Sequence, residues 1–169
     1  MLAESDRPAA SAPRPPLKAI GLAWLGAVLA ISTLALASSE TGWAMILGSF
    51  GASCTLLFAY PDGPFSQPRN VVLGHLFSSF VGLVLVKTLG PSWWAMGLAV
   101  GTAVAVMMAT RTVHPPAGSN PVIIFLADPG WTFLIFPTAA GAVALMIGAT
   151  FYNRLARRQA KPLIGATGT

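Results

Sequence analysis

The sequence predicts an all-α protein: a polytopic transmembrane helical bundle of about five spanning helices plus a short re-entrant half-helix. Hydrophobic residues make up 54% of the chain and charged residues only 9%, whereas a soluble domain carries about 25% charged residues. Five apolar runs each approach the roughly 20 residues that cross a bilayer core as a helix. Aromatic residues at run ends fit an interfacial belt, and they are Trp43, Trp93, Trp94, Trp131 and Tyr152.

The predicted spans follow the apolar runs in chain order and cover residues 19–37, 43–59, 71–89, 93–110 and 131–152. The first run is longer than the roughly 7–15 apolar residues of a secretion signal, so we expect it to be retained. A sixth run, residues 122–127, is too short to span and predicts the re-entrant half-helix or a broken part of the neighbouring span. Asp128 and Pro129 are expected to begin the last helix, and Pro137 is expected to kink it.

One transmembrane domain, residues 17–158, is expected between two flexible tails, residues 1–16 and 159–169. The formal net charge of +5 would suggest nucleic acid in a soluble protein, but no basic stripe with interleaved aromatic residues exists here. The basic excess lies at the ends of the chain, where it sets topology or contacts anionic lipid headgroups. We therefore expect the lipid bilayer as a partner and no nucleic acid.

A weak internal repeat joins two parts of the chain. The tripeptide Trp-Ala-Met occurs at residues 43–45 and again at 94–96, and each copy leads through an apolar helix into a proline-rich break. The breaks are YPDGPFSQPRN, residues 60–70, and RTVHPPAGSNP, residues 111–121. Different parts of the repeat give offsets that disagree by two residues, so a duplicated two-helix unit is a hypothesis. Under it, the breaks would face one another around a pseudo-two-fold axis, as in many transporters.

The two breaks are the predicted binding site. Irregular backbone at membrane depth is tolerated only where it is buried in protein or lines a cavity. Helix N-termini attract anions, and we expect Pro68 in the first turn of one following helix and Asn120 as the cap of the other. The predicted substrate-binding residues are Arg69, Asn70, His75, Arg111, His114, Gly118, Ser119 and Asn120. The helix breaks are made by Pro64, Pro68, Pro115, Pro116 and Pro121.

This pattern indicates an electropositive pocket for a small anion, and it leaves one alternative open. Both breaks could instead be surface loops whose arginines contact phospholipid headgroups. His75 shares a helical face with Ser78, Ser79 and Gly82. Its ring is therefore expected either on the pathway or in an interhelical hydrogen bond, since lipid cannot satisfy it.

Small residues at four-residue spacing form two stripes that allow helices to approach closely, within or between subunits. A homo-oligomer is therefore a possible arrangement. The stripes are Gly97, Gly101 and Ala105, and Ala44, Gly48 and Ala52.

Nothing in the sequence predicts an enzyme. Paired carboxylates are missing, because Glu40, Asp62 and Asp128 are single and far apart. No spacing of His, Cys and Asp suggests a metal site, and the GxxxxGK[ST] and GxSxG motifs are absent. We therefore expect no catalytic residue, no cofactor and no metal.

At His114-Pro115-Pro116-Ala117-Gly118 the chain resembles the HPP family of integral membrane proteins, which is named for the tripeptide His-Pro-Pro. Supporting stretches are QPRN at residues 67–70 followed by Gly-His at 74–75, and residues 131–155 with their Phe-Pro pair. The resemblance covers about residues 17–158. It implies a small polytopic helical domain similar to the nitrite transporters of plastids and cyanobacteria. The chain departs from the family at residues 119–121, Ser-Asn-Pro, where members tend to have small residues.

The residues and the resemblance both favour a transporter or channel for a small monovalent anion, with nitrite first and nitrate or formate equally compatible with the physics. We expect it in the inner (plasma) membrane of a bacterium. Two alternatives belong to other classes. One is a non-transporting assembly module that packs through the small-residue stripes, and the other is a membrane enzyme that modifies lipid headgroups.

Overall fold

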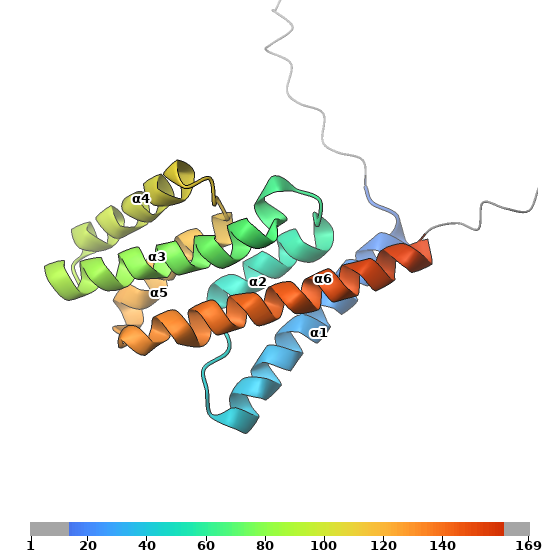
Figure 1. The fold of residues 1–169 in the computed structure, drawn as a ribbon, viewed down its shortest axis with the longest axis horizontal. Helices are drawn as coiled ribbons and strands as arrows, with labels where there is room; N and C mark the ends of the chain where they lie inside the picture. Colours follow the sequence, from blue (N-terminus) through green and yellow to red (C-terminus); the bar gives the residue numbers. More distant parts are fainter. Residues whose placement is uncertain (1–13, 161–169) are drawn as a thin grey trace, which may run out of the picture.

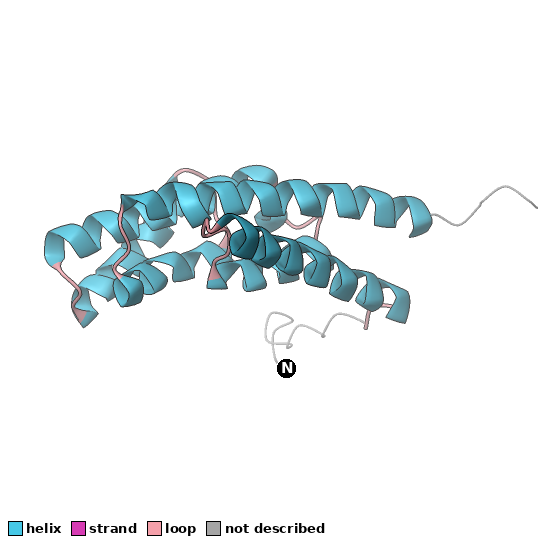
Figure 2. Cartoon of the chain, turned by 90° about the horizontal axis from the view of Figure 1, so that it is seen from below, coloured by secondary structure: helices cyan, strands magenta, loops and turns pink. Residues whose placement is uncertain are grey.

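The computed structural model describes residues 14–160, and all the regular structure in this range is helical, as predicted. Helix α4 lies against α3, and α1 crosses α6 (Figure 1). Viewed from below, the helices form a flat, elongated bundle (Figure 2). The α-helices are α1 (Leu17–Thr41), α2 (Gly48–Cys54), α3 (Pro68–Leu89), α4 (Trp93–Ala109), α5 (Asn120–Ala127) and α6 (Ala140–Ala160).

Within residues 14–160, three helical stretches are long and apolar enough to cross a membrane: Leu17–Thr41, Pro68–Leu89 and Trp131–Ala156. Two further apolar helices, Gly48–Ala59 and Trp93–Ala109, are shorter. The bundle therefore has the character of a polytopic membrane domain, whereas the number of five spans stays a prediction.

The second predicted span, residues 43–59, is helical only from Gly48 onward. Gly42 ends α1 in the left-handed conformation, with φ 70°, which glycine adopts at no steric cost. The backbone N–H of Met45 then donates to Ser38 Oγ at 2.7 Å, and this bond holds the non-helical segment against α1. After α2 the chain continues as a π-helical segment, η2 (Thr55–Ala59).

The last predicted span is also interrupted, and the interruption is the kink that Pro137 predicts. The run starts as a 3₁₀ helix, η5 (Trp131–Leu134), and a π-helical segment, η6 (Ile135–Ala139). Phe136 has extended backbone angles, φ −127° and ψ 122°. Proline has no N–H and its ring clashes with the preceding turn, so regular α-helix resumes only at Ala140.

The predicted helix starts have mixed outcomes. Pro68 occupies the first turn of α3, as expected. Asn120 does not cap α5 but is its first residue, and Ser119 stands at the cap position with no side-chain hydrogen bond to the helix. Asp128 does not begin the last helix. It ends α5 with φ 41°, a conformation that Asn and Asp adopt more readily than other non-glycine residues.

The duplicated two-helix unit and the two flexible tails stay predictions. The helices that follow the two breaks differ in length, since α3 has 22 residues and α5 has eight, so the duplicated unit stays a hypothesis. Most of the two predicted tails, residues 1–16 and 159–169, lies outside the described residues. Helix α6 runs to Ala160, slightly past the expected domain end.

Apolar side chains form two clusters that share α3. One joins α1, α2 and α6 and includes Phe50, Leu57 and Leu145. The other joins α3, α4 and α5 and includes Leu83 and Ile124. Between these ends, the buried face of α3 is polar, and the functional candidates lie there.

Candidate functional site

A layer of buried polar side chains occupies the middle of the bundle. Charged residues take no part in it, because every Asp, Glu, Lys and Arg between residues 14 and 156 is exposed. Burying so many polar groups in an apolar bundle is costly unless they find hydrogen-bond partners. The layer comprises Ser49, Ser53, Ser66, His75, Ser78, Ser79, Thr112, His114, Asn120 and Thr138.

Two histidines from different elements meet at one serine. Ser53 Oγ on α2 lies 3.0 Å from His75 Nε2 on α3 and 2.8 Å from His114 Nε2 in the second break. The other ring nitrogens are also bonded. His75 Nδ1 lies 3.1 Å from Asn120 Nδ2, and His114 Nδ1 lies 2.8 Å from the carbonyl oxygen of Phe65. A continuous chain of five residues thus runs from α5 to the first break.

When both histidines are neutral, the groups at the two ends of this chain of hydrogen bonds decide which atom donates and which accepts at every step. A carbonyl only accepts, so His114 Nδ1–H donates to Phe65, and His114 Nε2 accepts from the Ser53 hydroxyl. At the other end the Asn120 amide donates to His75 Nδ1. His75 Nε2–H then donates to Ser53 Oγ. The orientation of the Asn120 amide is supported by its additional bonds to the His75 carbonyl, 3.3 Å, and Ser79 Oγ, 2.8 Å.

The two breaks pack together across the start of α3. Arg69 Nη2 donates to the carbonyl oxygen of Thr110 at 2.8 Å, and Asn70 Nδ2 donates to that of Val113, also at 2.8 Å. One turn further along α3, a Cβ at Gly74 would lie 2.9 Å from His114 Cβ. Only glycine at this position lets His114 come so close to α3.

The structure places the predicted binding residues in two groups. His75, His114 and Asn120 lie in the buried chain, and half-buried Asn70 joins the breaks. Arg69, Arg111 and Ser119 are exposed, and Gly118 is half-buried. Ser119 Oγ bonds the Pro116 carbonyl at 2.8 Å, which stabilises the turn formed by the 3₁₀ helix η4 (Pro115–Ser119).

Sequence reasoning missed Ser53, the residue that links the two histidines. Ser49 and Ser53 are four residues apart in an apolar run, which puts both on one helical face, and this was the available signal. Thr138 was missed too, and its hydroxyl donates to Ser79 Oγ at 3.1 Å.

Two surface hollows border the breaks, and neither is lined by both breaks. The hollow beside the second break is lined by Ala52, Thr55, Leu56, Pro115, Pro116 and Ser119. The hollow beside the first is about 220 Å³ and is lined by Leu57, Pro61, Ser66, Gln67, Pro68, Met146, Thr150, Asn153 and Arg154. The two breaks are joined directly by the bond between His114 Nδ1 and the Phe65 carbonyl.

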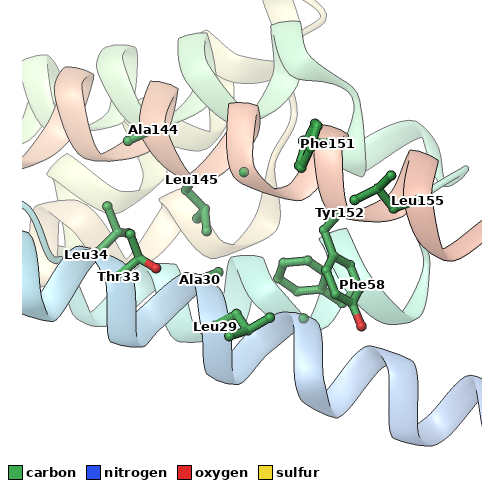
Figure 3. Close-up of a pocket in the computed structure, with 12 residues that line it drawn as sticks. Leu29, Ala30, Thr33, Leu34, Phe58, Ala144, Leu145, Phe151, Tyr152 and Leu155 are labelled. Atoms are coloured by element: carbon green, nitrogen blue, oxygen red, sulfur yellow. The ribbon is translucent and has the colours of Figure 1, made fainter.

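A third hollow, of about 340 Å³, lies between α1 and α6 (Figure 3). Its lining side chains are almost all apolar, including Leu29, Leu34 and Phe58. The Tyr152 hydroxyl on its wall donates to the Leu22 carbonyl at 2.7 Å. With no charged group in its lining, this hollow does not suit an anion.

Two buried polar atoms of the layer have no hydrogen-bond partner in the structure: Asn120 Oδ1 and Ser49 Oγ. Unpaired buried polar atoms are uncommon and point to a ligand, water or a functional role. Among the described residues, no group of three His, Cys, Asp or Glu side chains could hold a metal ion.

Comparisons with known proteins show which family the chain belongs to. The model of the HPP transmembrane region matches residues 12–162. Two Dictyostelium discoideum proteins described as transmembrane proteins are 35% and 33% identical to the chain, over 89% of its length in each case. The chain spans 52% and 57% of their lengths. No solved structure matches the chain. The protein is therefore an integral membrane protein and belongs to the HPP family.

Proposed function

We propose that the protein is a transporter or channel that passes a small monovalent anion, with nitrite as the first candidate, across the inner membrane of a bacterium. The observation that carries this proposal is the buried polar layer joined to two helix breaks. Ionisable side chains within a membrane domain often mark a solute pathway, because a solute that leaves water needs polar partners inside the membrane.

The charge distribution favours an anion at the entrance. Arg69 donates to the carbonyl of Thr110, the residue directly before Arg111, so two exposed arginines are brought to the start of the second break. A local excess of positive charge raises the concentration of anions at a surface. His114 lies three residues further along the chain and connects this end to the buried layer.

Uptake into liposomes by the purified protein tests the proposal. Nitrite, nitrate and formate are supplied separately, and empty liposomes give the background. We expect Arg69→Ala and His114→Ala to lower nitrite uptake at least tenfold while the protein remains inserted and folded. Lys87→Ala is the matched control, because Lys87 is an exposed cation at the other end of α3, and its uptake should equal that of the unchanged protein. Full uptake by both site variants would remove the site assignment.

A second candidate, a membrane assembly module without transport activity, is favoured by the outer face of α4. Gly97, Gly101 and Ala105 are exposed there, and a Cβ at either glycine would meet no atom within 4 Å. Such faces allow close helix contacts in lipid. This candidate predicts no flux of any anion and a stable complex after gentle extraction, which Gly101→Leu would dissociate.

A further inference from the structure

The buried polar layer lacks a charged side chain that could neutralise an anion inside the bundle. The arginines of both breaks, Arg69 and Arg111, are exposed, as are all other charged residues between 14 and 156. An unpaired charge in a low-dielectric interior is strongly unfavourable. An anion alone would therefore meet a high barrier at this layer, and a proton that crosses with it would remove most of that barrier.

We propose that the anion crosses together with one proton, which is held by the chain of His75, Ser53 and His114, so that transport is electroneutral. This inference rests on the proposed function and names the coupling ion. Among the side chains of the layer, only the histidine rings can take up and release a proton, and the two rings are joined here through a single hydroxyl.

The chain can take up a proton and remain fully hydrogen-bonded. In the neutral state, Ser53 Oγ accepts from His75 Nε2–H and donates to His114 Nε2. When a proton binds to His114 Nε2, this new N–H donates to Ser53 Oγ. The Ser53 hydroxyl then turns to the carbonyl oxygen of Ser49, 3.2 Å away. One N–H bond forms as the proton leaves a hydronium ion on the acidic side, no covalent bond of the protein breaks, and release of the proton to water restores the first arrangement.

Only one proton fits on this chain. The centroids of the two histidine rings are 5.0 Å apart, and two positive charges at that distance repel each other strongly in a low-dielectric interior. The remaining site, His75 Nδ1, faces the donor group of Asn120, so a second proton would also remove a hydrogen bond. This predicts a ratio of one proton for each anion.

The unpartnered oxygen of Asn120 adds to the barrier for an anion that crosses without the proton. Asn120 is fully buried, and its Oδ1 has no hydrogen-bond partner. An amide carbonyl oxygen can only accept. It therefore repels the oxygens of the free anion.

The elements packed around the two histidine rings contribute no buried charged side chain that could bind the proton or repel it. Asp62, Arg69, Lys87, Arg111 and Arg154 are all exposed, and α4 and α5 contain no titratable side chain. Of the uncharged groups, Cys54 lies in the apolar cluster of α2, and Tyr152 on α6 donates to α1. Within the described residues, the two histidines are thus the titratable groups of the layer.

Nitrite uptake into liposomes that contain the full-length protein and a trapped pH-sensitive dye tests this inference. The outside is made acidic, and in parallel a potassium gradient with valinomycin sets the membrane potential; empty liposomes report passive entry of nitrous acid. We expect one proton to enter for each nitrite, and a positive interior to change the rate less than twofold. Uptake that is accelerated by the positive interior, without internal acidification, would overturn the inference while leaving anion transport in place.

Ser53→Ala tests the assignment of the chain, because it removes the hydroxyl that joins the two rings. We expect nitrite uptake to fall at least tenfold. Thr88→Ala is the matched control, since this exposed hydroxyl near the other end of α3 donates to the carbonyl of Val84 outside the layer, and the ratio of one should persist. Coupled uptake at the full rate in Ser53→Ala would refute the assignment. If that variant does not fold, the ratio of protons to nitrite measured on the unchanged protein decides whether transport is coupled to a proton. If the unchanged protein takes up no anion at all, the proposed function itself is refuted.

Discussion

Replacing Gly74 with alanine tests how closely α3 must approach the second break. A Cβ at this position would lie 2.9 Å from His114 Cβ and 2.9 Å from the carbonyl oxygen of Thr112. The carbonyl belongs to the backbone and cannot rotate away, so α3 and the break would have to separate. Overpacking of this kind costs about 1–3 kcal/mol, and the higher helix propensity of alanine offsets about 1 kcal/mol of it.

Gly21→Ala provides the matched control in the interior of α1, because a Cβ there would meet no atom within 4 Å. This change carries the same gain in helix propensity and no overpacking, so the two variants should differ by about 1–3 kcal/mol in the free energy of unfolding. The assay is unfolding in mixed detergent micelles, followed by circular dichroism. If Gly74→Ala proves at least as stable as Gly21→Ala, the close approach of α3 to His114 is refuted.

Two further predictions concern bonds at the edges of the bundle. Tyr152→Phe keeps the ring contact with Phe58, at a centroid distance of 5.6 Å, but loses the bond to the Leu22 carbonyl, so thermal unfolding should show a loss of about 1 kcal/mol; an unchanged stability would contradict that bond. Lys87→Ala breaks an ion pair with Asp128 whose side chains are 38% and 64% exposed. The same measurement should show a loss of at most about 1 kcal/mol, and a much larger loss would mean that the pair is buried in the protein.

Composition and periodicity were sufficient for the class of protein and for several helices. The predicted runs at residues 71–89 and 93–110 correspond closely to α3 and α4, because a long apolar segment in lipid must satisfy its own backbone and does so as a helix. Pro68 marked the start of α3 for a local reason, since the missing N–H of proline costs nothing in a first turn. The short apolar run after the second break likewise predicted α5.

Local pattern was insufficient wherever a distant group decided the conformation. Residues 43–47 are apolar enough for a helix, yet the bond from Met45 to Ser38 holds them outside one. Asn120 is a good capping residue by type, but its amide bonds His75 and Ser79 on α3 instead. Such competition between a local and a remote partner is invisible in the sequence.

The amino-acid sequence by itself determined that this chain is a helical membrane protein with two proline-rich interruptions, because apolar run length and proline chemistry act locally. The tertiary structure decided which polar groups meet. It placed Ser53 between two histidines that lie 22 and 61 residues further along the chain, and it left the arginines of the breaks at the surface. Hydrogen bonds between remote segments depend on how the helices pack, and no spacing along the chain encodes that packing.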